Sequence, residues 1–102
     1  MSFEKYIIVT NDEKECYKVS GSFLPLTEIN KVFRNGWDTE EEAQFALSVI
    51  TKEWRQRLCD EYIIGINKKI KRARDTLKKL QEAKIIKVKS TYEFVRTYEF
   101  VR

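Results

Sequence analysis

The stretch from Thr39 to Lys84 places the strongest constraint on how this chain folds. It contains no proline and one glycine, Gly65, and apolar residues recur along it every three or four positions. This spacing places the apolar residues on one side of an α-helix and predicts a long helix over residues 39–84. Glu42 follows Thr39 by three residues, which is the spacing of a capping box. We therefore expect the threonine side chain to cap the start of the helix.

Two apolar stripes run along the predicted helix, one on each side of Gly65. The first stripe consists of Ala43, Leu47, Ile50, Trp54, Leu58 and Tyr62. The second stripe, which is our predicted self-association surface, consists of Ile66, Ile70, Ala73, Leu77 and Leu80. Its alternating spacings of four and three residues are those of a coiled-coil seam. The sequence leaves open whether the helix continues through Gly65 or folds back there, because one glycine costs a helix only about 1 kcal/mol.

Residues 1–38 are expected to form a small cap on this helix. The apolar run at residues 6–9 and the alternating residues 15–19 predict the two strands of a β-hairpin, joined by the polar turn residues between them. An apolar linker and then a short helix, residues 28–34, are expected to follow. Gly36 is expected to end the short helix at positive φ, and Trp37 to anchor the cap against its neighbours.

Residues 85–96 return to an alternating pattern and predict a strand that joins the hairpin. One face of this strand is predicted to carry Ile86, Val88, Tyr92 and Phe94. The hexapeptide Thr-Tyr-Glu-Phe-Val-Arg fills residues 91–96 and is repeated in residues 97–102. Because six is an even number, the second copy keeps the same faces, so we expect it to extend the strand or to replace the first copy after a shift of register. This tail is expected to be dispensable.

The fold class that these elements predict is α+β. Residues 1–102 are expected to form a single domain, made of an N-terminal hairpin and short helix, one long helix with coiled-coil character, and a C-terminal strand that returns to the hairpin. A chain of 102 residues has the length of one domain.

The composition argues against an enzyme. The chain has no histidine, which is the commonest general base and metal ligand. The cluster Glu40, Glu41 and Glu42 is explained by the start of the helix, and Cys59 lies in mid-helix without a base. We therefore expect no catalysis, no metal and no cofactor. Two cysteines are too few for a disulfide framework, and no segment reads as a signal peptide or a membrane span, so we expect a cytoplasmic protein without a membrane partner.

Charge is distributed unevenly along the chain. Residues 1–61 hold eight Lys and Arg against twelve Asp and Glu, whereas residues 62–102 hold twelve against four. The basic residues in the second half of the helix form our candidate binding surface: Lys68, Lys69, Lys71, Arg72, Arg74, Lys78 and Lys79. Two hypotheses follow. The chain is a protein-binding module that uses its charged helix, or it is a nucleic-acid-binding protein that uses residues 68–89 to follow phosphates.

The same charges limit how the helix can associate with a copy of itself. A parallel homodimer places like charges opposite each other and is disfavoured. An antiparallel arrangement brings the acidic start beside the basic end, either between two chains or within one chain that folds back at Gly65. This arrangement predicts that residues 40–42 meet Lys78, Lys79 and Lys84, and that Glu53 approaches Arg72.

The layout resembles that of small orphan proteins of bacteriophages. The resemblance rests on the Tyr-Ile-Ile-Val hairpin at residues 6–9, the helix opening Trp-Asp-Thr-Glu-Glu-Glu-Ala at residues 37–43, and the closing Tyr-Glu-Phe-Val at residues 92–95. Many such proteins bind and block a host factor, including nucleases of bacterial defence such as CRISPR nucleases. The resemblance therefore implies a small inhibitor or adaptor that acts on a host protein in the host cytoplasm.

Overall fold

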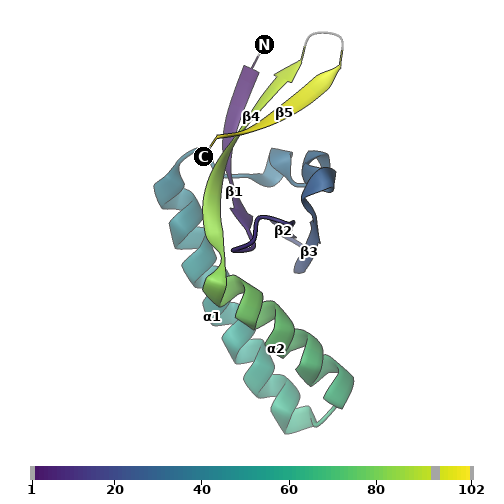
Figure 1. Cartoon of the computed structure of the whole chain (residues 1–102). Helices are drawn as coiled ribbons and strands as arrows, with labels where there is room; N and C mark the ends of the chain where they lie inside the picture. Colours follow the sequence, from purple (N-terminus) through teal and green to yellow (C-terminus); the bar gives the residue numbers. More distant parts are fainter. Residues whose placement is uncertain (1, 93–94, 102) are drawn as a thin grey trace.

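The chain forms a five-stranded antiparallel sheet that carries a pair of α-helices (Figure 1). The computed structural model describes residues 2–92 and 95–101. The strands are β1 (Ser2–Val9), β2 (Glu15–Lys18), β3 (Ser22–Pro25), β4 (Lys84–Tyr92) and β5 (Arg96–Val101), in the order β3-β2-β1-β4-β5. The helices are the 3₁₀ helices η1 (Leu26–Lys31) and η2 (Phe33–Asn35) and the α-helices α1 (Glu40–Ile64) and α2 (Asn67–Glu82). The predicted α+β class is confirmed.

β1 lies in the middle of the sheet and is apolar on both faces. Ile7 and Val9 belong to one buried cluster, while Ile8 between them belongs to another on the opposite face. A strand covered on both faces needs no polar alternation, which explains the continuous apolar run. β1 pairs with β2, as predicted, and with β4 along its whole length, from Ser2 opposite Thr91 to Val9 opposite Lys84.

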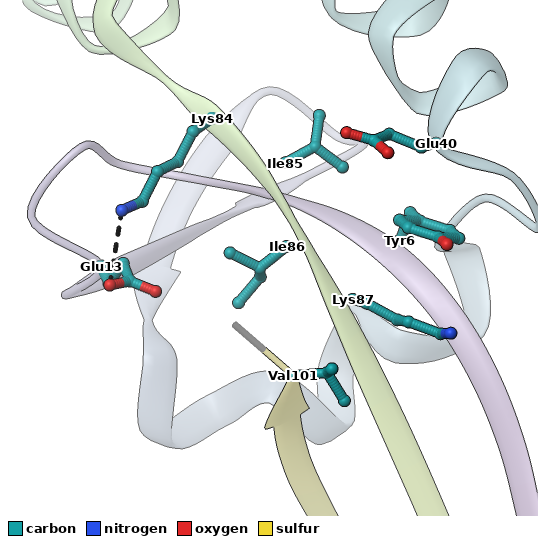
Figure 2. Close-up of a pocket in the computed structure, with 8 residues that line it drawn as sticks. All are labelled: Tyr6, Glu13, Glu40, Lys84, Ile85, Ile86, Lys87 and Val101. Carbon is teal, nitrogen blue, oxygen red and sulfur yellow. Dashed lines mark ion pairs between the residues drawn. The ribbon is translucent and has the colours of Figure 1, made fainter.

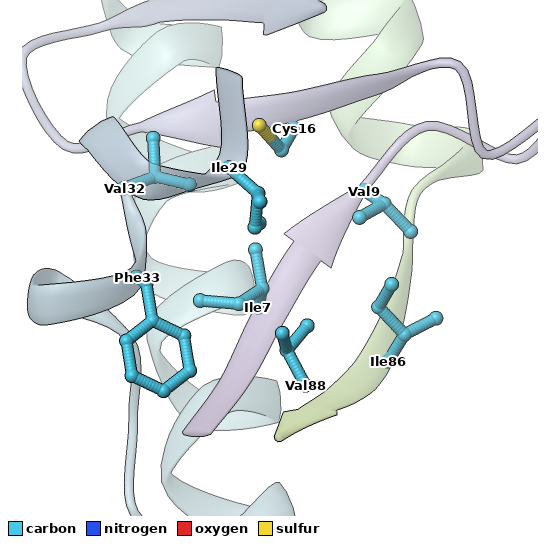
Figure 3. Packing of buried hydrophobic residues seen from close by; sticks show 8 residues of the cluster. All are labelled: Ile7, Val9, Cys16, Ile29, Val32, Phe33, Ile86 and Val88. Carbon is cyan, nitrogen blue, oxygen red and sulfur yellow. The ribbon is translucent and has the colours of Figure 1, made fainter. Parts of the chain in front are cut away.

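The sheet separates two hydrophobic clusters. The first cluster packs beneath η1 and η2 (Figure 3) and consists of Ile7, Val9, Cys16, Ile29, Val32, Phe33, Ile86 and Val88. The second cluster packs beneath the α-helices and consists of Ile8, Tyr17, Trp54, Ala73, Leu77 and Leu80. Trp37 is half-buried against the second cluster, and its backbone forms a bridge with Tyr6 of β1.

The structure corrects three details of the predicted cap. The expected linker is the strand β3, which pairs with β2 from Glu15 opposite Pro25 to Lys18 opposite Ser22. The expected short helix is a pair of 3₁₀ turns, η1 and η2. Gly36 has φ −69°, so it does not provide a positive φ. Glycine is required there because an added Cβ would lie 2.5 Å from Cδ1 of Ile7.

The predicted long helix is two helices. Thr39 caps α1 as expected, since its hydroxyl accepts a hydrogen bond from the backbone N–H of Glu42 at 3.1 Å. Gly65 then ends α1 in the left-handed conformation, with φ 80°, and α2 begins after Ile66. Because the connection has only two residues, α1 and α2 lie side by side and antiparallel (Figure 1). We call this pair the helical hairpin.

The C-terminal tail is also different from the prediction. The second copy of the hexapeptide does not extend β4. Instead, the chain turns back and forms β5, which pairs with β4 from Tyr92 opposite Arg96 to Lys87 opposite Val101. Tyr98 and Phe100 of β5 pack against the first cluster, so the tail contributes to the core. Positions 93, 94 and 102 of the predicted strand and tail lie outside the described residues.

Candidate functional site

The seven predicted binding residues all lie on α2. Six of them are exposed: Lys68, Lys69, Lys71, Arg72, Arg74 and Lys78. Lys79 is half-buried, because its ammonium group pairs with Glu15 of β2 at 2.9 Å and lies 5.4 Å from the ring centre of Phe23. Within residues 2–92 and 95–101, no ion pair joins the other six to a carboxylate. Lys79 therefore belongs to the packing of the fold, whereas the other six are exposed and, apart from the contact of Arg74 with Tyr62, are free to face solvent.

The predicted self-association residues are largely used inside the chain. Ala73, Leu77 and Leu80 are buried in the second cluster, where they face the sheet and α1. Ile70 is half-buried, and only Ile66 is exposed. The seam of α2 thus has its partner within the same chain, so these three buried residues are not available to a second copy.

The structure does not contain the predicted ion pairs between the acidic residues of α1 and the basic residues of α2. α1 has 25 residues and α2 has 16. At about 1.5 Å per residue, the acidic first turn of α1 therefore lies beyond the end of α2. Lys79 and Lys84 pair instead with Glu15 and Glu13, near β2. No ion pair joins Glu53 to Arg72 in the described part of the chain.

The turn of the helical hairpin points away from the sheet (Figure 1). An exposed apolar group of side chains occupies this turn. Its members, which we call the hairpin apex, are Tyr62, Ile63, Ile64 and Ile66. The exposed fraction is 85% for Ile63 and 62% for Ile64. Isolated exposed apolar residues are ordinary, but a contiguous exposed group marks an interaction site.

The segment from Tyr62 to Arg74, which contains the hairpin apex, carries only positive charge, although Glu61 directly precedes it and Asp75 directly follows it. Residues 62–74 contain Lys68, Lys69, Lys71, Arg72 and Arg74 and no Asp or Glu. The guanidinium group of Arg74 donates a hydrogen bond to the hydroxyl of Tyr62 and lies 5.8 Å from the centre of its ring. This contact joins α2 to α1 beside the turn, so the apolar and basic groups are held on one structural unit.

A basic hollow of about 340 Å³ lies where the hairpin leaves the sheet. Three cationic side chains and one carboxylate line it: Arg57 and Glu61 of α1, and Lys69 and Arg72 of α2. Its floor includes Trp54, whose indole N–H donates to the hydroxyl of Tyr17 at 3.2 Å and whose ring lies 4.4 Å from the guanidinium carbon of Arg57. The positive surface therefore continues from the hairpin apex to the body of the protein.

A second hollow, of about 380 Å³, lies beside the start of β4 (Figure 2). Lys84 and Lys87 line it, and both ammonium groups are paired, with Glu13 at 3.4 Å and with Glu4 at 3.1 Å. The hydrogen bond that Lys87 donates to the carboxylate of Glu4 raises the pKa of Lys87, so this lysine is held in its charged form and is a poor base.

The two free cysteines differ in exposure. Burial raises the pKa of the Cys16 thiol to about 11, which keeps it protonated and unreactive at neutral pH. Cys59 is exposed on α1. Among the described residues, no group of three or more His, Cys, Asp and Glu side chains is placed to hold a metal ion.

Sequence reasoning found the basic residues of α2 but missed Ile63 and Ile64. The signal was present, because residues 62–66 are apolar on all sides of a helix and one face alone can be buried. No family model, no curated protein and no solved structure matches the chain. The resemblance to bacteriophage proteins therefore stays a prediction. No helix within the described residues has the length and apolar character that crossing a membrane requires.

Proposed function

We propose that the chain is a non-enzymatic protein-binding module that makes contact through the hairpin apex and the basic residues beside it. The observation that carries the proposal is the exposure of Ile63 and Ile64 at the turn of a projecting hairpin. Its bacteriophage-type layout favours an inhibitor or adaptor of a host protein, including a nucleic-acid-handling or defence protein such as a CRISPR nuclease.

The chemistry of the surface defines the partner. A convex apolar apex fits a concave apolar groove, and the exposed Lys68 and Lys71 behind it fit carboxylates on the rim of that groove. Burying one isoleucine side chain contributes about 1.5–3 kcal/mol. Replacing both Ile63 and Ile64 by serine is therefore expected to weaken binding by about 3–6 kcal/mol if both side chains become fully buried, or roughly 100- to 10,000-fold.

The test is affinity purification of the tagged chain from its native host, followed by quantitative mass spectrometry. The double variant Ile63→Ser/Ile64→Ser should lose the specific partner. Phe45→Ser is the matched control, because Phe45 is an equally exposed apolar residue of α1, at 71%, far from the turn. A partner captured equally by the double variant and the wild type would place the binding surface elsewhere and refute the proposal.

Nucleic-acid binding is the alternative function, and one observation favours it. Lys68, Lys71 and Lys78 are exposed on α2, and no ion pair in the described residues neutralises them. Helical lysines can contact successive phosphates, and binding then weakens as salt rises, with a log–log slope of about −0.9 per contact on duplex DNA.

An electrophoretic shift with duplex DNA and single-stranded RNA, at low and at moderate salt, tests this alternative. Replacing Lys68, Lys71 and Lys78 together by glutamine should reduce the salt slope, whereas Lys18→Gln on β2 should leave it unchanged. Absence of binding at low salt would exclude the nucleic-acid function and leave the protein-binding proposal standing.

A further inference from the structure

The two edge strands of the sheet are protected to different degrees. β3 has four residues, ends at Pro25 and continues directly into η1. β5 has six residues, none of which is proline, glycine or lysine. Short strands, prolines and lysines are the usual means by which a protein prevents another strand from pairing with its edge. In the described part of the chain no strand lies on the outer side of β5, so its outward backbone groups are open to pairing.

The side chains along β5 alternate between a packed face and an exposed face. Tyr98 and Phe100 pack on the first cluster, and the ring of Tyr98 meets that of Phe33 edge-on, with centroids 5.4 Å apart. Val95, just before the strand, is 73% exposed, and Val101 at its end is 43% exposed. Val95 lies in a bend directly before β5, and an extended conformation at this residue would place it on the same face as Val101, because side-chain directions repeat every two residues.

We propose that β5 pairs with β5 of a second copy of this chain, antiparallel and around a twofold axis. The strand suits itself as a partner for two reasons. It carries one Arg and one Glu, so two copies bring no net charge together. Each copy also carries an exposed valine near each end of the strand, so an antiparallel partner supplies one apolar side chain to cover the other.

The side chains select the register of this pairing. A twofold axis requires one residue to lie opposite its own copy. If that residue is Tyr98, Thr97 lies opposite the partner subunit's Glu99, and extension of each strand by one residue places Val95 opposite the partner subunit's Val101. If it were Glu99, two carboxylates would face each other, which destabilises a pair of strands. The register centred on Tyr98 therefore joins the exposed valines and continues the aromatic face across the axis.

This dimer differs from the helical dimer that the coiled-coil pattern suggested. It joins the two sheets into one and leaves the hairpin apex of each copy free. The inference therefore does not depend on the proposed protein-binding function, and either proposal can fail without the other.

Sedimentation equilibrium of the full chain, from low to high micromolar concentration, tests the association. We expect a reversible monomer–dimer equilibrium, and Val95→Lys/Val101→Lys should abolish it by placing lysines opposite each other. Val19→Lys is the matched control, since Val19 is an exposed valine, at 58%, near the opposite edge of the sheet. A monomer at every concentration would overturn the proposal. So would a dimer that survives the double lysine variant but is lost in Ile63→Ser/Ile64→Ser.

Cysteine cross-linking tests the register in a Cys59→Ser background. Directly opposed residues of antiparallel strands have Cα atoms about 4.5–5.5 Å apart, within the roughly 4.4–6.8 Å range of disulfides. Tyr98→Cys should therefore form a covalent dimer on mild oxidation, whereas Glu99→Cys should not, because the two copies of residue 99 are offset along the strands. Rapid cross-linking of Glu99→Cys without that of Tyr98→Cys would refute the proposed register.

Discussion

Gly36 is the position where the packing of the sheet can be tested most sharply. A Cβ at this residue would lie 2.5 Å from Cδ1 of Ile7, 2.9 Å from Cβ of Lys5 and 3.1 Å from the carbonyl oxygen of Phe33. The backbone cannot move away freely, because the next residue, Trp37, exchanges two hydrogen bonds with Tyr6, of 3.0 and 2.7 Å. Gly36→Ala therefore forces a side chain into occupied space beside the central strand.

The expected cost of this substitution is that of overpacking, about 1–3 kcal/mol. The contribution of the clash with Ile7 to this cost can be measured separately, because valine at position 7 lacks the Cδ1 atom that makes the closest contact. Ile7→Val alone is expected to cost about 0.5–1.5 kcal/mol. In that background Gly36→Ala should cost less, with a coupling free energy of at least about 0.5 kcal/mol. The rescue should be partial, since the contact with Lys5 remains.

Urea unfolding of the wild type, both single variants and the double variant provides the four free energies of this cycle. Tryptophan fluorescence is a suitable probe, because Trp54 is buried and Trp37 is half-buried in the folded chain. A Gly36→Ala variant as stable as the wild type would refute the close approach. Strictly additive effects of the two substitutions would show that Ile7 is not what the new methyl group meets.

Three further predictions test other parts of the fold. Gly65→Ala should destabilise the chain by about 1–2 kcal/mol, because the φ of 80° at this position is unfavourable for residues with a Cβ, although the space around Gly65 is open. Gly65→Asn should cost less, because asparagine tolerates the left-handed conformation better, and urea unfolding measures both variants. Thr39→Ala should cost about 1 kcal/mol by removing the acceptor for the N–H of Glu42, which urea unfolding and helix content report. The pKa of Cys16 is raised from 9.0 to about 11 in the folded chain, so unfolding favours the thiolate and stability should fall as the pH rises above 9. Cys16→Ala should lose this part of the pH dependence, and a thiol reagent should label only Cys59 in the native protein.

The local signals in the sequence predicted the structure well where one mechanism dominates. The Thr39 cap, the apolar run of β1 and the alternation of β4 each depend on a few neighbouring residues, and all three are confirmed. β3 was missed because Pro25 reads as a linker, although an edge strand tolerates a proline at its end. β5 was missed because the second copy of the hexapeptide continues the alternating pattern of the first copy, and no Gly, Pro or Asn marks a turn between them.

The choice at Gly65 was not decided by local chemistry. A glycine permits a left-handed turn but does not require one, and the coiled-coil seam of α2 accepts a partner from the same chain or from another. What decides it is the sheet. Ile8 and Tyr17 lie in the same cluster as Trp54, Leu77 and Leu80, so the second cluster is complete only when both helices lie over one face.

The fold-back also explains why apolar and positive surfaces coincide. The hairpin encloses the apolar seam from Ala73 onward, but α1 and α2 have no sheet beneath them near the turn, so Ile63 and Ile64 stay exposed. The carboxylates of β2 and its preceding turn pair with Lys79 and Lys84 at the other end of α2. Residues 62–74 themselves contain no Asp or Glu, and in the described part of the chain no ion pair joins their cations to a carboxylate. A partner that binds here must supply both an apolar groove and negative charge. Replacing the exposed lysines by glutamine and replacing Ile63 and Ile64 by serine should therefore each weaken binding to the same partner.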